Sequence, residues 1–117
     1  MSASVRNRLW IGNEWADAAS GASFESINPA TGEVITNVAE GDAADIDQAV
    51  AAAQAAMANP KWTGMNPHKR SHLMWKLADA IEANIDELAT LETQDNGKPF
   101  FESRYADLPL VVEIYRY

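Results

Sequence analysis

Asp95 is the ionisable residue whose position most needs a chemical explanation. It lies in the stretch LETQDNGKPF, residues 91–100, where Gly97 and Pro99 indicate the end of a helix. That end carries the negative pole of the helix dipole, so an acidic side chain there costs a few tenths of a kcal/mol unless a positive charge offsets it. Either Asp95 is a solvated turn residue or a positive group lies beside it. The group would be Lys98, in the adjacent loop, or a bound cation, because carbonyl and carboxylate oxygens suit hard ions.

The remaining chemistry-bearing residues form no catalytic constellation. His68 and His72 are four residues apart, a spacing that can hold a metal ion, but Lys69, Arg70 and Ser71 separate them and no carboxylate accompanies them. We interpret the pair as solvated surface. No glycine-rich loop follows a predicted strand, so a phosphate cradle is not predicted. The chain has no cysteine, which excludes disulfides, thiolate metal ligands and a cysteine nucleophile from these residues.

Composition limits the class of protein and its partners. The 117 residues are 47% apolar and 22% charged, which is typical of a globular protein. Nine basic and seventeen acidic residues give a formal net charge of 9 − 17 = −8, a field that repels nucleic acid and anionic membranes. No apolar run approaches the ~20 residues that span a bilayer, and no signal peptide is expected. With the lack of cysteine, these features predict a cytoplasmic protein.

The first forty residues predict short strands. Apolar and β-branched residues separated by turn signals place them near residues 8–11, 14–18, 23–27 and 33–39. Gly12-Asn13 is a hairpin turn signal, and residues 28–32 (NPATG) also have turn chemistry. We therefore expect N-terminal β-hairpins. The four tryptophans are scattered over different elements, and we expect them in a buried core or a subunit contact rather than in a ligand box; they are Trp10, Trp15, Trp62 and Trp75.

From Asp42 onward the periodicity predicts four to five helices. Asp42 can cap the first helix, whose apolar face recurs at three- and four-residue spacing and which ends at Asn59-Pro60. Asn66-Pro67 opens the second, and Asn84 opens the third, with Glu87 in a capping-box arrangement. Gly97 is the residue that stops the third helix. Residues 100–107 predict a short helix and Leu108 begins the last one. The fold class predicted for the chain alone is α+β, with strands within residues 8–39 and helices within 43–117.

The last predicted helix reaches Tyr117 without a capping glycine or a polar tail. Its apolar face, which contains Val111, Val112 and Tyr115, continues to the end of the sequence. A terminal helix normally closes with polar or positive residues. We therefore expect residues 1–117 to be part of a larger domain that is truncated within an element.

Several long motifs together resemble one known family. The stretches INPATGEVITNVAEGDAADIDQAVAAAQAA, RSHLMWKLADAIEANIDELATLETQDNGKPF and VVEIYRY are similar to the N-terminal portion of the NAD(P)-dependent aldehyde dehydrogenase superfamily. The likeness extends from about Leu9 to the end, and the pairing of NPATGEV and AEGD with LETQDNGKP at this spacing is highly specific.

This resemblance implies a longer α/β enzyme with a Rossmann-type coenzyme domain, to which residues 1–117 would belong, a catalytic domain and an arm for homo-oligomerisation. The implied activity is oxidation of aldehydes to carboxylates with NAD or NADP, by way of a cysteine thiohemiacetal. The cysteine, the glutamate base, the oxyanion-hole asparagine and the coenzyme glycines all lie downstream in the family. No catalytic or cofactor-binding residue is therefore assigned here, and we expect this chain alone to be inactive. The implied partners are the remainder of the dehydrogenase chain and other subunits.

The resemblance also assigns a metal site. Many family members hold a structural monovalent cation, K⁺ or Na⁺, through the two residues before NP and the aspartate of DNG. The matching positions are Ser26, Ile27 and Asp95. A further ligand lies beyond residue 117 in the family, so only part of the site is expected here. The resemblance thus favours the cation interpretation of Asp95.

A second hypothesis belongs to a different class. The chain could be an independent, small, acidic helical module that binds another protein and has no enzymatic activity. The exposed apolar face predicted for the last helix favours the dehydrogenase hypothesis, because a chain that functions alone should cover such a face.

Overall fold

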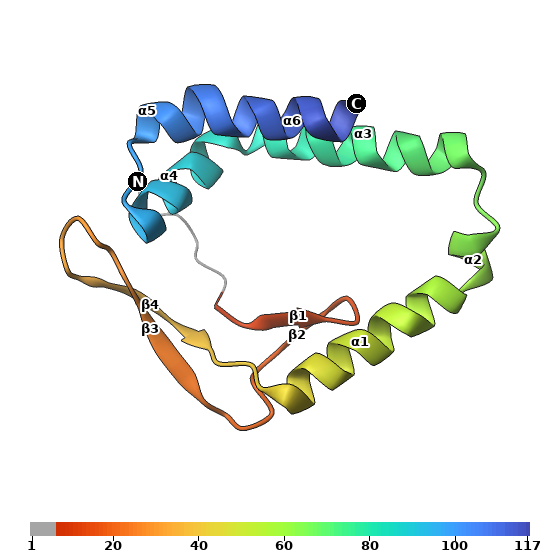
Figure 1. Cartoon of the computed structure of the whole chain (residues 1–117), viewed down its shortest axis with the longest axis horizontal. Coiled ribbons are helices and arrows are strands. Elements are labelled where there is room, and N and C mark those ends of the chain that lie inside the picture. The colour runs from red at the N-terminus through yellow and green to blue at the C-terminus, as the bar shows by residue number, and fades with distance from the viewer. Residues whose placement is uncertain (1–6) are drawn as a thin grey trace. The chain divides into compact units, whose positions relative to one another are not determined.

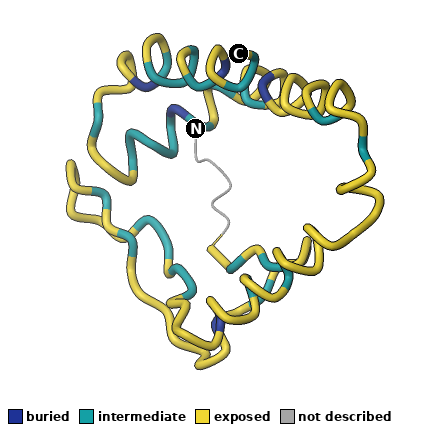
Figure 2. Tube along the Cα trace, turned by 45° about the vertical axis from the view of Figure 1, so that its right-hand side comes forward, coloured by how far each residue is buried: buried dark blue, intermediate teal, exposed yellow. Residues whose placement is uncertain are grey.

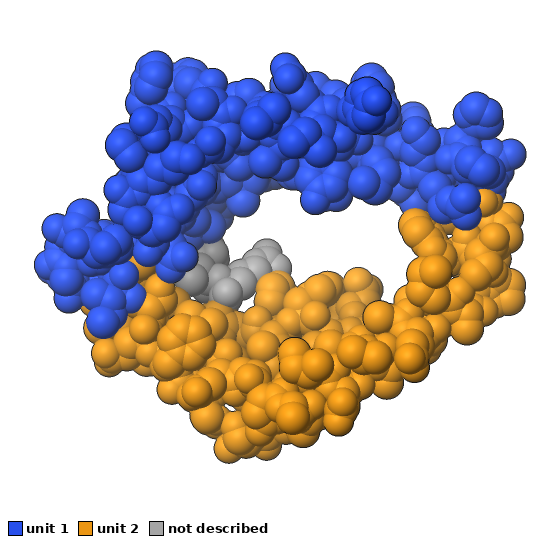
Figure 3. Space-filling model, viewed as in Figure 1, with its two compact units in different colours: residues 1–4, 27–33, 66–117 blue, residues 5–26, 34–65 orange. Residues whose placement is uncertain are grey.

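The computed structural model describes residues 7–117, which divide into two compact units. The first unit contains residues 27–33 and 66–117, and the second contains residues 7–26 and 34–65 of the described chain (Figure 3). Strand pairs come first and helices follow (Figure 1), which confirms the predicted α+β class.

The second unit begins with a tight hairpin of β1 (Leu9–Ile11) and β2 (Glu14–Ala16). Gly12 and Asn13 both have positive φ, 60° and 71°, as a two-residue type I′ turn requires. The strands are antiparallel, with Trp10 opposite Trp15, and the two indole rings lie 4.7 Å apart between centroids. Hairpin and turn are therefore where the sequence predicted them.

A second pair of strands follows, β3 (Ser23–Ile27) and β4 (Val34–Ala39). The connecting turn, residues 28–33, belongs to the first unit and is closed by its own hydrogen bonds. The Asn28 amide donates to the Glu33 carbonyl over 2.9 Å, and the Gly32 amide donates to the Asn28 carbonyl over 2.8 Å. The Asn28 side chain accepts from the Ala30 amide, an Asx turn that fixes Pro29 at the turn's start.

Helix α1 (Ala43–Ala58) begins in a reciprocal cap of two aspartates. The Asp42 side chain accepts from the Ala44 amide, and Asp45 accepts from the Asp42 amide over 2.9 Å. The other carboxylate oxygen of Asp45 accepts from the Ala19 amide over 2.9 Å, and Asp45 is only 4% exposed. Asp45 therefore ties the loop after β2 to the start of α1 in addition to capping the helix.

A short helix, α2 (Pro60–Thr63), follows α1 directly. Asn59 ends α1 and also caps α2, because its side chain accepts from the Lys61 amide. Proline at the first position of α2 needs no hydrogen-bond acceptor there. One residue thus serves both helices, which is why the chain turns without an extended linker.

The first unit is built from α3 (Pro67–Ala83), α4 (Ile85–Asn96) and a continuous helical run from Phe100 to Arg116. Asn66 caps α3 through the His68 amide, as predicted. The run consists of α5 (Phe100–Glu102), a π-helical turn η1 (Ser103–Asp107) and α6 (Leu108–Arg116). Helix α6 lies along α3 (Figure 1), and Arg116 forms ion pairs with Asp79 and Glu82 of α3.

The two separate C-terminal helices expected from sequence are one helix with a π turn. Pro109 has no N–H, and its ring would clash with the carbonyl of Tyr105 in an α-helix. The chain avoids a break by widening the preceding turn, where the Leu108 amide donates to the Ser103 carbonyl five residues back.

The capping box predicted at Asn84 and Glu87 is wrong. Asn84 does precede α4, but its side chain makes no cap hydrogen bond there. It donates instead to the Ala80 carbonyl at the end of α3, over 2.8 Å. Because α3 and α4 follow each other directly, Asn84 serves the unpaired carbonyls of the first helix rather than the amides of the second.

Within residues 7–117 the buried apolar side chains are small. They are Ala18, Ala78, Ala89 and Val112. Exposed residues cover much of the trace in Figure 2. Large apolar side chains remain exposed on α1, on α3 and on the run from Phe100 to Arg116. The side chains of Trp10, Trp15, Trp62 and Trp75 are each between 38% and 53% exposed. The core interpretation of the tryptophans is therefore wrong for this chain by itself, while a subunit contact stays a prediction.

Candidate functional site

The C-terminal end of α4 has the shape that the sequence predicted. Gly97 is left-handed, with φ at 78°, and its amide donates to the Thr93 carbonyl over 3.0 Å. The Asn96 side chain then accepts from the Lys98 amide over 2.7 Å, which turns the chain away from the helix axis. Asp95 lies exposed in the last helical turn, where main-chain carbonyls lack helical partners.

The turn after β3 lies against this helix end. A Cβ atom added at Gly97 would come within 2.9 Å of the Pro29 Cγ atom, so the glycine is needed for space as well as for its positive φ. Pro29 and Gly97 belong to the same unit, as do Ile27 and Asp95. Sequence-distant segments that carry two of the three predicted cation ligands are thus brought together.

The three predicted ligands differ in their surroundings. Ile27 is 49% exposed, Asp95 is exposed and Ser26 is half-buried. Ser26 is the neighbour of Ile27 in the chain but belongs to the second unit. In residues 7–117 no group of three or more His, Cys, Asp or Glu side chains could hold a metal, so a cation here would depend on main-chain oxygens together with Asp95.

Lys98, the alternative counter-charge for Asp95, is engaged elsewhere. Its ammonium forms an ion pair and hydrogen bond with Asp107 of η1. The Asp107 hydrogen bond raises the pKa of Lys98 above its ordinary value of 10.5, against a smaller opposing effect of desolvation. The lysine therefore fixes the α4–α5 connection to the π turn, a contact that sequence reasoning missed because its partners are nine residues apart.

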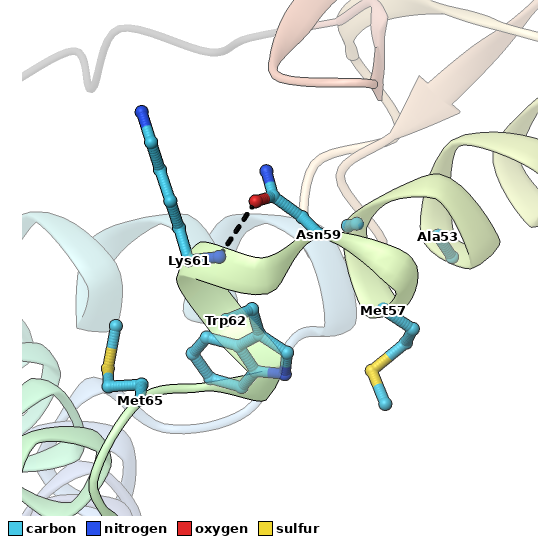
Figure 4. Close-up of a pocket in the computed structure, with 7 residues that line it drawn as sticks. Ala53, Met57, Asn59, Lys61, Trp62 and Met65 are labelled. Atoms are coloured by element: carbon cyan, nitrogen blue, oxygen red, sulfur yellow. Dashed lines mark hydrogen bonds between the residues drawn. The ribbon is translucent and has the colours of Figure 1, made fainter.

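Other surface features carry weaker chemistry. His68 and His72 are exposed, in agreement with the solvated-surface interpretation. A hollow of about 540 Å³ lies at the end of α1, lined mainly by apolar groups that include Met57, Trp62 and Met65. Figure 4 shows the Asn59 side chain turned toward the Lys61 amide beside this hollow. The open, apolar lining holds no catalytic pair.

Comparison with known proteins decides the family. The sequence pattern described as the aldehyde dehydrogenase family matches residues 15–117. The chain belongs to the aldehyde dehydrogenase family. It is 50% identical over 113 residues to the mitochondrial aldehyde dehydrogenase X of Bos taurus, and the match covers 95% of this chain but 22% of the relative.

Solved structures of dehydrogenases contain the same backbone. The P. syringae AldA indole-3-acetaldehyde dehydrogenase in complex with NAD⁺ and IAA superimposes with a TM-score of 0.94 at 37% identity. The NAD⁺ complex of the Bacillus cereus aldehyde dehydrogenase gives a TM-score of 0.92 at 42% identity. Each match covers 97% of this chain and 23% of the solved chain. The family member described here therefore spans about a fifth of its relatives' length.

No helix in residues 7–117 combines the length and apolar character needed to cross a membrane.

Proposed function

We propose that residues 1–117 are the N-terminal scaffold of an enzyme that oxidises aldehydes to carboxylates with NAD⁺ or NADP⁺. The observation that carries this proposal is the superposition of 97% of the chain on an aldehyde dehydrogenase solved with NAD⁺. The nicotinamide coenzyme would accept the hydride from the substrate. The chain itself has no cysteine, so the thiol nucleophile must come from the remainder of the enzyme.

A chimera tests the catalytic proposal. Residues 1–117 replace the matching segment of the Bacillus cereus dehydrogenase, and reduction of NAD⁺ and NADP⁺ is measured with several aldehydes. We expect turnover by the chimera and none by the 117-residue chain, because only the chimera contains a thiol nucleophile. A folded chimera without activity, or turnover by the short chain, would contradict the proposal.

The proposed enzyme also binds K⁺ or Na⁺ through Ser26, Ile27 and Asp95. The residues fit such an ion, because the last carbonyls of α4 and the Asp95 carboxylate are hard oxygen ligands at the negative pole of a helix. The contact between Pro29 and Gly97 supports a site shared by the two segments. The ion would supply structural cross-linking rather than chemistry on the substrate.

Salt-dependent melting of the chimera tests the cation. K⁺ should raise its Tm more than choline does at equal ionic strength, because an ion that binds only the folded state stabilises it. Asp95→Ala should reduce this difference, whereas Glu102→Ala, at an exposed site in the same unit, should leave it unchanged. Equal K⁺ effects in Asp95→Ala and the unaltered chimera would remove the assignment.

Assembly and location complete the proposal. We propose that the enzyme is a cytoplasmic homo-oligomer, for which exposed apolar surface and the lack of cysteine give support. The bovine relative is named as mitochondrial, so cell fractionation with an antibody to the native protein is the relevant measurement. Sedimentation of the chimera would give its subunit number.

A further inference from the structure

Asn96 differs from every other asparagine of the sequence in the residue that follows it, which is glycine. An asparagine side chain can be attacked by the main-chain nitrogen of the next residue, which closes a cyclic imide. Proline has no N–H for this reaction, and a Cβ on the next residue crowds the nitrogen, whereas glycine has none. The other asparagines precede proline (Asn28, Asn59, Asn66), a β-branched residue (Asn37, Asn84) or a long charged one (Asn7, Asn13).

The end of α4 requires this reactive pair of residues. Gly97 has a φ of 78°, and a Cβ atom there would come within 2.9 Å of the Pro29 Cγ atom, so the backbone and the packing both favour glycine. The side-chain oxygen of Asn96 accepts from the Lys98 amide over 2.7 Å as the chain leaves the helix. The asparagine–glycine sequence therefore follows from how α4 stops.

The two reacting groups are held in different ways. Asn96 and Gly97 are exposed, so water reaches both. The Lys98 amide donates to the Asn96 Oδ1 atom and would stabilise the negative charge that develops on this oxygen during attack on Cγ. The Gly97 amide, which is the nucleophile, donates to the Thr93 carbonyl over 3.0 Å. The carbonyl carbon is thus activated while the attacking nitrogen is held in the helix.

Opening of the last turn of α4 would release the nucleophile. Helix ends open locally at a much lower free energy than the core of a domain. The ion pair between Lys98 and Asp107 opposes this opening, because it ties the residue after Gly97 to η1.

We propose that Asn96 is a site of spontaneous deamidation whose rate is set by opening of the hydrogen bond between Gly97 and Thr93. In the open turn the Gly97 nitrogen loses its proton and bonds to the Asn96 Cγ atom. The bond from Cγ to Nδ2 breaks, and Nδ2 leaves as ammonia with that proton. One water molecule then hydrolyses the imide. Cleavage of the new bond to Cγ gives aspartate, and cleavage of the bond to the main-chain carbonyl carbon gives isoaspartate.

Both products alter the end of α4, and neither depends on the proposed enzymatic activity. Aspartate at position 96 adds a negative charge beside Asp95, at the negative pole of the helix. Isoaspartate routes the main chain through the former side chain and adds a carbon atom between residues 96 and 97. The Gly97 amide then loses its bond to Thr93, so the isoaspartate form is the less stable of the two.

Incubation at neutral pH followed by peptide mass mapping tests the site. The 117-residue chain and the chimera are incubated folded, and deamidated residues are located by fragmentation of the peptides. Asn96 should deamidate at least about tenfold faster than Asn37 and Asn84, which are also exposed, because Gly97 has no Cβ to hinder attack. Asn96→Gln, whose longer side chain does not form the same ring, should give no such product at position 96.

Unfolding and one substitution test the control by the helix end. In urea the rate at Asn96 should rise at least about tenfold, because the last turn is then always open. Lys98→Met should raise the rate in the folded proteins several-fold and leave the rate in urea unchanged. Lys61→Met, at an exposed lysine of α2, is the matched control and should change neither rate.

Each remaining outcome overturns a stated part of the proposal. Faster deamidation at another asparagine, or none at Asn96 in the folded proteins, would overturn the site. Equal rates at Asn96 in urea and in proteins with a full helical circular-dichroism signal would overturn control by the helix end. The isoaspartate fraction, separated by chromatography, should melt several degrees below the Asn96→Asp variant, and equal Tm values would contradict the effect assigned to the longer main chain.

Discussion

Gly97 satisfies a backbone requirement and a packing requirement at one position. Its φ of 78° is costly for other residues, by roughly 1–2 kcal/mol, because a Cβ would crowd the following carbonyl. At Gly97 the Cβ would also meet Pro29 at 2.9 Å, whereas at Gly32, with φ at 74°, nothing lies within 4 Å. A substitution at Gly32 therefore tests conformational strain alone, and the same substitution at Gly97 tests strain together with steric contact.

We predict that Gly97→Ala destabilises the chain more than Gly32→Ala. Gly32→Ala should cost about 1–2 kcal/mol through strain alone, and Gly97→Ala should cost more because Pro29 must move. Urea unfolding followed by circular dichroism measures both. Equal losses would show that the contact between the turn and α4 contributes no stability, and would weaken the assignment of the cation ligands to one place.

Deprotonation of Lys98 should lower the stability of the folded chain at alkaline pH. Because the pKa of Lys98 is raised in the folded chain, the ion pair with Asp107 contributes fully below the ordinary value of 10.5 and is lost as pH rises through the higher folded value. We predict that Lys98→Met lowers the unfolding midpoint at pH 7 and that the difference from the unaltered chain shrinks above about pH 10.5. In an Asp107→Asn background the substitution should show no such pH trend; a difference that persists at high pH would contradict the pairing.

At the scale of the element, the π turn η1 buries the hydroxyl group of Ser103, to which the described residues offer no hydrogen bond. Ser103 is fully buried, and its Oγ atom has no hydrogen-bond partner among residues 7–117. An unsatisfied buried donor costs about 1–3 kcal/mol. We predict that Ser103→Ala leaves stability unchanged or raises it by up to about 1 kcal/mol, as measured by urea unfolding. Val112→Ala, which removes buried methyl groups, should instead destabilise the same run. A clear loss in Ser103→Ala would mean that the hydroxyl contributes to stability.

Elements that depend on local signals were predictable from the sequence, and elements that depend on distant contacts were not. Gly12-Asn13 and Asn66-Pro67 define the first hairpin and the start of α3 by their own backbone preferences. Asn84 has the right type for an N-cap, but a carbonyl of the preceding helix competes for its side chain. Residues 100–107 and the helix from Leu108 were expected to be separate, yet packing of Val112 against the rest of the unit favours a widened turn within one helix.

In the candidate site, too, the local features were predictable from the sequence and the contacts between distant residues were not. The turn chemistry of Asn28 and the stop at Gly97 were both evident in the sequence, but nothing local predicts that Pro29 packs on Gly97, almost seventy residues away. Ser26, Ile27 and Asp95 were assigned through the resemblance to aldehyde dehydrogenases. The structure brings Ile27 and Asp95 into one unit, and the ion itself stays a prediction.

At the scale of the whole molecule, residues 7–117 expose much of the apolar surface that their periodicity assigns to interior faces. Ile46, Val50 and Met57 follow helical spacing on α1, yet each is at least half exposed. Amphipathic helices gain most of their stability from packing of the apolar face. The apolar pattern therefore fits helices that pack inside a larger fold, in agreement with a chain that spans about a fifth of the length of its relatives.

The fluorescence of the tryptophans reports directly how far these apolar surfaces are exposed to water. All four are at least 38% exposed, and they occur in both units. We predict that acrylamide quenches their fluorescence efficiently in the 117-residue chain, with red-shifted emission, because water and quencher reach the indole rings. In the chimera, emission from Trp10, Trp15, Trp62 and Trp75 should shift to the blue and become harder to quench, with the host's own tryptophans replaced by phenylalanine. Protected, blue-shifted emission from the short chain would show that the 117 residues bury their tryptophans unaided. That result would contradict the inference that these apolar faces pack inside a larger fold.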